Sequence, residues 1–216
     1  NGLFKLDFEN LRIASVLGRI GLAWSIAAVL YLNFGVKTRA AIAVAVLAGY
    51  GALSALVAAP DAAGAGPLTF EGNLAGYIDR QFLPGKLIYG SFDPEGLLST
   101  VPAVVTAMLG MFTGEFVRRS DIRGGRKTLW MAAAAAALLA AGLAFSGVLP
   151  VNKKLWSSTF VCVVGAYSLG RCALFYYLID VWGWRRWTLF FRVVGLNSIT
   201  IYLAQRIVGF GRISDF

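Results

Sequence analysis

Long apolar runs separated by short polar segments are the feature that most limits how this chain can fold. Six such runs occupy residues 13–34, 40–59, 97–116, 129–149, 156–178 and 189–208. A helix of about 20 apolar residues is long enough to cross the roughly 30 Å hydrocarbon layer of a bilayer. Only 14% of the residues are charged, fewer than a soluble surface requires. The sequence therefore predicts an all-α fold, a polytopic transmembrane helix bundle of about six spans that forms one membrane domain over residues 1–216.

The distribution of Lys and Arg predicts how these spans are oriented. Residues 35–39, 118–128 and 181–187 together hold nine basic residues in 23 positions, whereas the alternate connections and the two ends hold seven in 63. Cytosolic loops of membrane proteins are enriched in Lys and Arg, so the first three segments are expected inside. This pattern also accounts for the net charge of +9, because no basic stripe or nucleic-acid-binding fold accompanies it. We therefore expect a multi-pass protein whose partner is the lipid bilayer, with no nucleic acid.

Metal chemistry is not expected from this composition. The sequence has no His and two cysteines, Cys162 and Cys172, which lie ten residues apart in one predicted helix. That separation is roughly 15 Å along a helix, too far for a disulfide between the two. Two thiols without imidazole do not make a zinc site, so no metal ligands are predicted.

The outer loop 60–96 and the segment after residue 150 contain the main candidates for a binding site. The loop is acidic and leads through Asp93 and Glu95 into the third span, where Ser99 and Thr100 follow one turn later. The next outer segment begins with Asn152 and Lys153, which are followed by further hydroxyls. The opposite charges of the two segments predict that they meet as a polar cup at the outer mouth.

Simpler interpretations of the same residues stay open. Asp93-Pro-Glu95 is typical of a helix start, and hydroxyls in a transmembrane helix often bond the carbonyl one turn back. A lysine at an interface commonly extends to lipid headgroups. The adjacent Asp79 and Arg80 are interpreted as a local ion pair rather than a site.

Four polar residues inside the apolar runs form a second group of candidates: Arg19, Arg171, Asn197 and Ser198. Charged side chains are costly within hydrocarbon and usually face the interior of a bundle. We therefore expect Arg19, Arg171 and Asn197 to face inward. They either line a ligand path or tie helices together, and the sequence alone does not separate these two roles.

Four segments in this order resemble one family of membrane enzymes. They are VLGRIGLAW at 16–24, DPEGLLST at 93–100, NKKLWSSTF at 152–160 and GLNSITIY at 195–202. Together they look like bacterial relatives of heparan-α-glucosaminide N-acetyltransferase. The resemblance implies transfer of an acetyl group from cytosolic acetyl-CoA to an amino sugar on the far side, in a bacterial inner membrane. It also implies that the segments at residues 93 and 152 face the sugar.

The chain departs from that family in lacking the catalytic His, which belongs to an outer loop between the family's first two helices. The resemblance therefore implies a chain that begins after the family's third helix, with no catalytic residue among these 216. The leading expectation is a transmembrane acyltransferase that uses acetyl-CoA as donor and an amine or hydroxyl of an extracytoplasmic sugar as acceptor. Basic residues of 118–127 could attract the CoA phosphates, although topology explains them equally well.

Two other functions remain open at this stage. The missing His favours a catalytically inactive relative that serves as a structural subunit of a larger membrane complex. A small-solute transporter is supported only by the polar residues within the spans, and the sequence has no evident internal repeat of the kind that many transporters contain.

Overall fold

The computed structural model describes residues 12–200 and residue 204. In this part of the chain the regular elements are all helices, which confirms the predicted all-α fold. Two compact units are distinguished, Asn1–Ala173 and Leu174–Phe216, and each is described by itself.

The first unit contains one short helix, four complete long helices and most of a fifth. The long helices are α2 (Val16–Asn33), α3 (Val36–Leu56), α5 (Leu97–Arg118), α6 (Gly124–Ala144) and α7 (Ser158–Tyr176), and the short one is α4 (Leu74–Phe82). Five helical segments in the described residues are long and apolar enough to cross a membrane: the first four long helices and Ser158–Val181. The protein is therefore a multi-pass helical membrane protein, in which these helices lie within a lipid bilayer.

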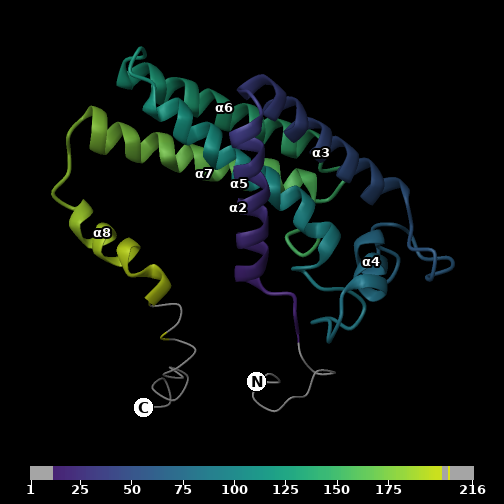
Figure 1. Ribbon diagram of the computed structural model, residues 1–216. Coiled ribbons are helices and arrows are strands. Elements are labelled where there is room, and N and C mark those ends of the chain that lie inside the picture. Colours follow the sequence, from purple (N-terminus) through teal and green to yellow (C-terminus); the bar gives the residue numbers. More distant parts are fainter. Residues whose placement is uncertain (1–11, 201–203, 205–216) are drawn as a thin grey trace. The chain divides into compact units, whose positions relative to one another are not determined.

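Helix α5 is the centre of the packing in this unit. Figure 1 shows α2 and α3 beside α5, and both helices pack against it. The buried contacts between them use small residues such as Ala23, Ala27 and Ala43 against Val105 and Met108 of α5. Lipid tails are as apolar as these side chains, so close van der Waals packing between small residues, rather than hydrophobic burial, holds such helices together.

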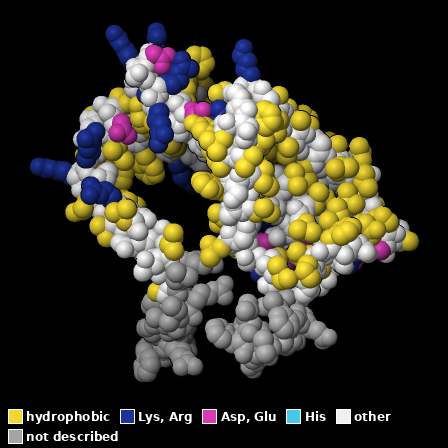
Figure 2. All heavy atoms as spheres, in the orientation of Figure 1, with side chains coloured by type: hydrophobic (Ala, Val, Ile, Leu, Met, Phe, Trp, Pro, Cys, Tyr) yellow, Lys and Arg dark blue, Asp and Glu magenta, His cyan; other side chains and the backbone are white. Residues whose placement is uncertain are grey.

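The outward faces of the helices are strongly apolar. Trp24, Leu32 and Leu129 expose 61%, 79% and 68% of their surface, respectively. Figure 2 shows hydrophobic side chains spread over most of the visible surface of the helices. In water such a surface would be unstable, whereas in a bilayer it is the face that contacts lipid.

The connections of the first unit gather at two opposite ends of the helices. One end, called the α4 end below, is formed by residues 12–15, 57–96 and 150–157. Bonds of Arg12 to Asp93 and Gly85 join the first two segments, and the third accepts a hydrogen bond from Tyr50 of α3 at the carbonyl of Leu155. The other, the α5–α6 turn end, contains residues 118–124. Loop 60–96 and segment 150–155 therefore share an end, and segment 118–128 lies at the opposite one.

The second unit contains the end of α7 and a shorter helix. Helix α7 continues into a π-helical turn, η1 (Tyr177–Val181), which is followed by α8 (Thr188–Leu196). Three indole rings form a cluster here: the ring centroid of Trp184 lies 6.2 Å from that of Trp182 and 5.8 Å from that of Trp187. The predicted span 189–208 begins with α8, and most of its remainder lies outside the described residues.

Candidate functional site

A buried carboxylate on α4 fixes the backbone that leads into α5. Asp79 is fully buried, and its two carboxylate oxygens accept hydrogen bonds from the backbone N–H groups of Asp93, at 3.1 Å, and Leu97, at 3.0 Å. Gly96 lies against this carboxylate so closely that a Cβ at residue 96 would be 2.1 Å from Oδ2 of Asp79. Burial raises the pKa of Asp79, while the two N–H donors oppose that rise.

The local ion pair predicted between Asp79 and Arg80 is absent from the described structure. Arg80 does not pair with Asp79; it makes two bonds of 2.7 and 2.9 Å to Asp61 instead. Adjacent residues of a helix point to different sides, so Asp79 faces the α5 entrance while Arg80 reaches back to the start of the loop. The signal that could have identified Asp79 is its spacing from Ala75 and Gly76, which share the buried face of α4.

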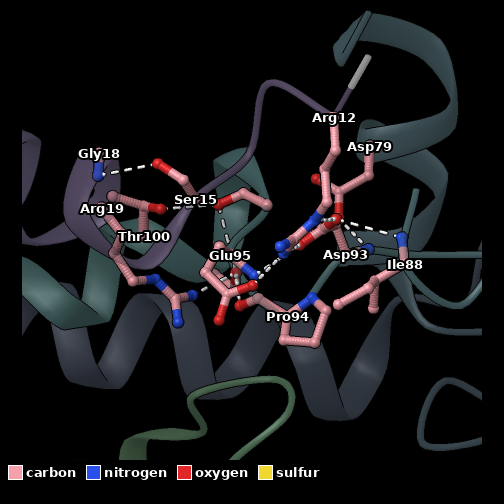
Figure 3. A network of polar contacts seen from close by, with 12 residues as sticks. Arg12, Ser15, Gly18, Arg19, Asp79, Ile88, Asp93, Pro94, Glu95 and Thr100 are labelled. Atoms are coloured by element: carbon pink, nitrogen blue, oxygen red, sulfur yellow. Dashed lines mark hydrogen bonds and ion pairs between the residues drawn. The ribbon is translucent and has the colours of Figure 1, made fainter. Parts of the chain in front are cut away.

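Arg12 clamps the two acidic residues predicted as site candidates. Its Nε donates to Oδ2 of Asp93 at 2.8 Å and its Nη2 to Oδ1 at 2.6 Å, and Nη2 also pairs with Glu95 (Figure 3). The carboxylate of Asp93 is fully buried, and it also accepts hydrogen bonds from the backbone N–H groups of Ile88 and Glu95. The pairing of Arg12 with Asp93 was not predicted, because 81 residues separate the two and no motif around Arg12 indicates an acidic partner.

These contacts decide the charge of the Asp93 carboxyl. Burial acts to raise its pKa, but the hydrogen bonds from Arg12 and from the N–H groups of Glu95 and Ile88 outweigh burial and hold the pKa below its usual value. The pKa of Arg12 is raised in turn, mainly by its bond to Asp93. The pair is therefore ionised at neutral pH.

Arg19 connects the two predicted outer segments inside the bundle. Its Nη2 donates to Oγ of Ser99 at 2.6 Å, and its guanidinium carbon lies 4.6 Å from the ring centroid of Trp156. Arg19 is only 6% exposed, as expected for a charge that faces the interior. Its Nε is buried without a hydrogen-bond partner in the described structure. Ser99 and the segment around residue 152 thus meet through Arg19.

Trp156 holds an unusual backbone conformation at this junction. Its φ is +52°, a left-handed value that is rare for a large side chain and costs free energy. The indole Nε1 donates to Oγ1 of Thr106 at 3.2 Å, and the ring packs edge-on against Phe160 at 5.1 Å. These contacts hold the indole over Arg19 at the mouth of the bundle.

The acidic residues of the predicted polar cup have other partners than expected. Arg12 rather than Lys153 balances Asp93 and Glu95, while Lys153 is exposed. Asn152 closes its own turn, since its side-chain oxygen accepts a bond from the N–H of Lys154 at 2.9 Å. The Nζ of Lys154 lies 4.4 Å from the ring centroid of Tyr89, so cation–π contact rather than an ion pair links the two segments here.

The hydroxyls predicted at the start of α5 have mainly local partners. Thr100 donates to the carbonyl of Gly96 at 2.7 Å, as the simpler interpretation expects. Ser99 contacts the carbonyls of Pro94 and Gly96 and also accepts the bond from Arg19. Helix α5 itself begins after Gly96, so Asp93 and Glu95 shape the preceding turn rather than cap the helix.

Three of the predicted intramembrane polar residues are exposed in the described structure. Arg171 is exposed beside the ring of Tyr167, with a centroid distance of 5.6 Å. Asn197 is exposed and donates to the carbonyl of Val193 in its own helix at 2.8 Å, and Ser198 is exposed as well. Arg19 is therefore buried as expected, whereas the inward orientation of Arg171 and Asn197, which are exposed among the described residues, stays a prediction.

A second buried arginine lies toward the α5–α6 turn end. Arg39 is 4% exposed, donates to Glu115 at 2.8 Å and contacts the rings of Tyr31 and Phe112. Arg39 was expected in the loop 35–39, whereas it lies in the first turn of α3. Because Arg39 is on α3 and Glu115 on α5, this pair joins the two helices at the end opposite Arg12 and Asp93.

The apolar helices and the polar cluster at the α4 end define a multi-pass membrane protein with a charged site at one end of its bundle. Among curated proteins, the chain is similar to human heparan-alpha-glucosaminide N-acetyltransferase, with 31% identity over 157 residues, and to the mouse protein, with 30% identity over 155 residues. Each match covers 63% of this chain. The chain is a distant relative of these acetyltransferases, which confirms the resemblance found from the four segments.

The matches cover only a part of those relatives. The aligned residues make up 23% of the human protein and 24% of the mouse protein, so the chain spans about a quarter of the curated relatives it matches. No protein-family model matches the chain.

Proposed function

We propose that the intact protein is a membrane acyltransferase that moves an acetyl or other acyl group from acyl-CoA in the cytosol to an amine or hydroxyl of an extracytoplasmic sugar. The observation that carries the proposal is the similarity to two curated membrane acetyltransferases. In the reaction, the acceptor nitrogen or oxygen forms a bond to the acyl carbon. The C–S bond of the thioester breaks, and the acceptor gives up one proton as the CoA thiol is released.

The α4 end suits the sugar acceptor. Amino sugars carry hydroxyls and a cationic amine, which carboxylates and aromatic rings recognise. Glu95 is half-buried beside Asp93, and Trp156 and Tyr89 provide aromatic faces at the same end. Glu95 is the better placed carboxylate for an acceptor, since Arg12 contacts one of its oxygens, whereas both oxygens of Asp93 are held by Arg12 and two backbone N–H groups.

The α5–α6 turn end suits the anionic part of the donor. Arg123 and Arg126 are exposed there, and such cations fit the phosphates of CoA. Arg119 is already paired with Asp121 at 2.6 Å, and Lys127 donates to the carbonyl of Val117 at 2.7 Å. With the basic segment on the cytosolic side of a bacterial inner membrane, donor and acceptor would approach from opposite faces.

The proposal is tested by measuring thiol release from acetyl-CoA with glucosamine as acceptor, using the full-length protein. We expect Glu95→Gln to raise the KM for glucosamine about tenfold, the typical effect of losing a hydrogen bond to a charged group, and to leave the KM for acetyl-CoA unchanged. The matched control is Asp121→Asn, an exposed carboxylate at the opposite end. Equal effects of the two substitutions would contradict a sugar site at the α4 end.

The 216-residue chain by itself is expected to show no turnover. It contains no His, and imidazole is the side chain that most readily takes and gives a proton near neutral pH. Turnover by this chain alone would contradict that account.

The alternative function is a structural subunit of a larger membrane complex. It is favoured by the absence of His from the sequence and by the pairing of Asp93 and Glu95 with Arg12, which keeps these carboxylates in structural contacts. A full-length protein that binds no acetyl-CoA, shows no turnover and purifies with other subunits would support this alternative.

A further inference from the structure

A deep apolar groove opens on the first unit where α5, α6 and α7 meet. Its volume is about 940 Å³. The groove exists because its floor is built from residues with little or no side chain. These include Gly110 and Gly114 of α5, Ala134 of α6 and Gly165 of α7.

The walls of this groove offer almost no hydrogen bonds to an occupant. Three hydroxyls line it: Thr113 donates to the carbonyl of Leu109 in its own helix at 2.8 Å, Thr106 accepts the bond from Trp156, and Ser168 of α7 is exposed. The other side chains along it are mainly aliphatic or aromatic, as at Trp130. Within the hydrocarbon layer, an occupant of such a groove must be mainly apolar, since several polar groups there would find one hydroxyl at most, that of Ser168.

The mouth of the groove has the opposite character. Arg118, the last residue of α5, lines it and is exposed. The turn that follows carries the further exposed cations Arg123 and Arg126. An apolar channel that ends at exposed guanidinium groups is complementary to a molecule with a long apolar tail and an anionic phosphate head.

We propose that this groove binds one anionic phospholipid, with an acyl chain between α5, α6 and α7 and the phosphate at Arg118. The lipid is a resident of the membrane layer and is distinct from the acyl donor. This assignment rests on the groove and its charge, and it holds whether or not the protein is an acyltransferase.

The glycines of the groove provide a sharp test. A Cβ at Gly110 or Gly114 would meet no atom within 4 Å, so a larger side chain there fills the groove without displacing protein. Gly49 on α3 is a matched control, because it too is an exposed helical glycine with open space around it but lies outside the groove.

The experiment measures binding of phosphatidylglycerol and phosphatidylcholine to the full-length protein in detergent by native mass spectrometry. We expect Gly114→Leu to reduce bound phosphatidylglycerol roughly tenfold or more, since the new side chain displaces several methylene groups. Gly49→Leu should leave lipid binding unchanged. Arg118→Gln should reduce the preference for phosphatidylglycerol over phosphatidylcholine about fivefold, the effect of one basic group near an anionic headgroup.

Three results would overturn the proposal. Equal lipid loss from the Gly114 and Gly49 variants would show non-specific binding to the apolar surface. Displacement of phosphatidylglycerol by acetyl-CoA would assign the groove to the donor. A change of oligomeric state in the Gly114 variant without loss of lipid would assign it to a second copy of the chain. If the Gly114→Leu variant does not fold, the lipid preference of Arg118→Gln decides, because the exposed Arg118 side chain at the mouth is not needed for folding.

Discussion

The carboxylate of Asp79 and the backbone of Gly96 are in direct contact, at a distance that leaves no room for a β-carbon on residue 96. This contact seats the end of loop 60–96 on α4 and determines where α5 begins. The acidic residues of the α4 end keep their positions because of it.

The first prediction concerns that contact. Gly96→Ala should destabilise the protein by about 1–3 kcal/mol, because the new methyl group overlaps a buried and hydrogen-bonded carboxylate. Unfolding in detergent by urea or heat measures the change. Gly35→Ala is the control, since Gly35 is also the N-cap of a membrane helix with φ near −68° but has open space around it. Equal loss of stability in both variants would mean that the backbone of an N-cap glycine, and not Asp79, is responsible.

The second prediction concerns Arg12. Arg12→Gln should cost about 3 kcal/mol of stability, because it leaves the buried carboxylate of Asp93 without its charged partner. Arg119→Gln breaks an exposed pair with Asp121 and should change stability little. The double variant Arg12→Gln with Asp93→Asn should recover part of the loss. A loss from Arg12→Gln no larger than that from Arg119→Gln would show that the clamp contributes little.

The third prediction is a dependence of stability on pH. The pKa of Asp93 is lower in the folded protein than its ordinary value of 3.8, so the unfolded chain binds more protons as the pH falls below neutrality. The stability contributed by the Arg12–Asp93 pair is therefore present above about pH 4 and is lost as the pH falls through the folded pKa. Unfolding measured between pH 7 and pH 3 should show this loss, and the Asp93→Asn variant should show less of it. Identical pH profiles would contradict the shift.

The fourth prediction tests the orientation derived from the basic residues. In a background with Cys162 and Cys172 replaced by Ser, a cysteine at Ala63 should react with an impermeant reagent from outside the cell. A cysteine at Gly125 should react only after the membrane is opened. Both positions are exposed, at opposite ends of the bundle. Labelling of both from the same side would refute the topology.

The spans could be predicted because their signal is local. Each of the five long helices is a run of apolar residues, and the requirement to satisfy backbone groups in lipid leaves helix as the only choice for such a run. The contacts of the candidate site could not be predicted in the same way. Arg12 and Asp93 are far apart in sequence, and many basic residues were equally eligible as partners of the acidic loop.

The direction in which a polar side chain points could not be predicted from the sequence either. Helix α7 is apolar on all sides, so its sequence does not indicate which face is buried, and Arg171 was expected inside although it is exposed. Arg19 was correctly expected to face inward, but its partners Ser99 and Trp156 come from two distant helices. For Asp79, adjacency to Arg80 suggested a local pair, whereas helical geometry separates the two side chains.

The contacts of Arg19 have a consequence for how the protein enters the membrane during synthesis. The ribosome produces α2 about 80 residues before Ser99 and still earlier than Trp156. Until those residues arrive, a guanidinium in the first turn of α2 must be accommodated by lipid headgroups and water, at a cost below the roughly 2.5–3.5 kcal/mol of a charge at the centre of a span. The later helices therefore stabilise α2 in the membrane by supplying the partners of Arg19. A nascent chain stalled after α3 should leave α2 accessible to glycosylation or protease at both ends, and extension past residue 160 should protect it.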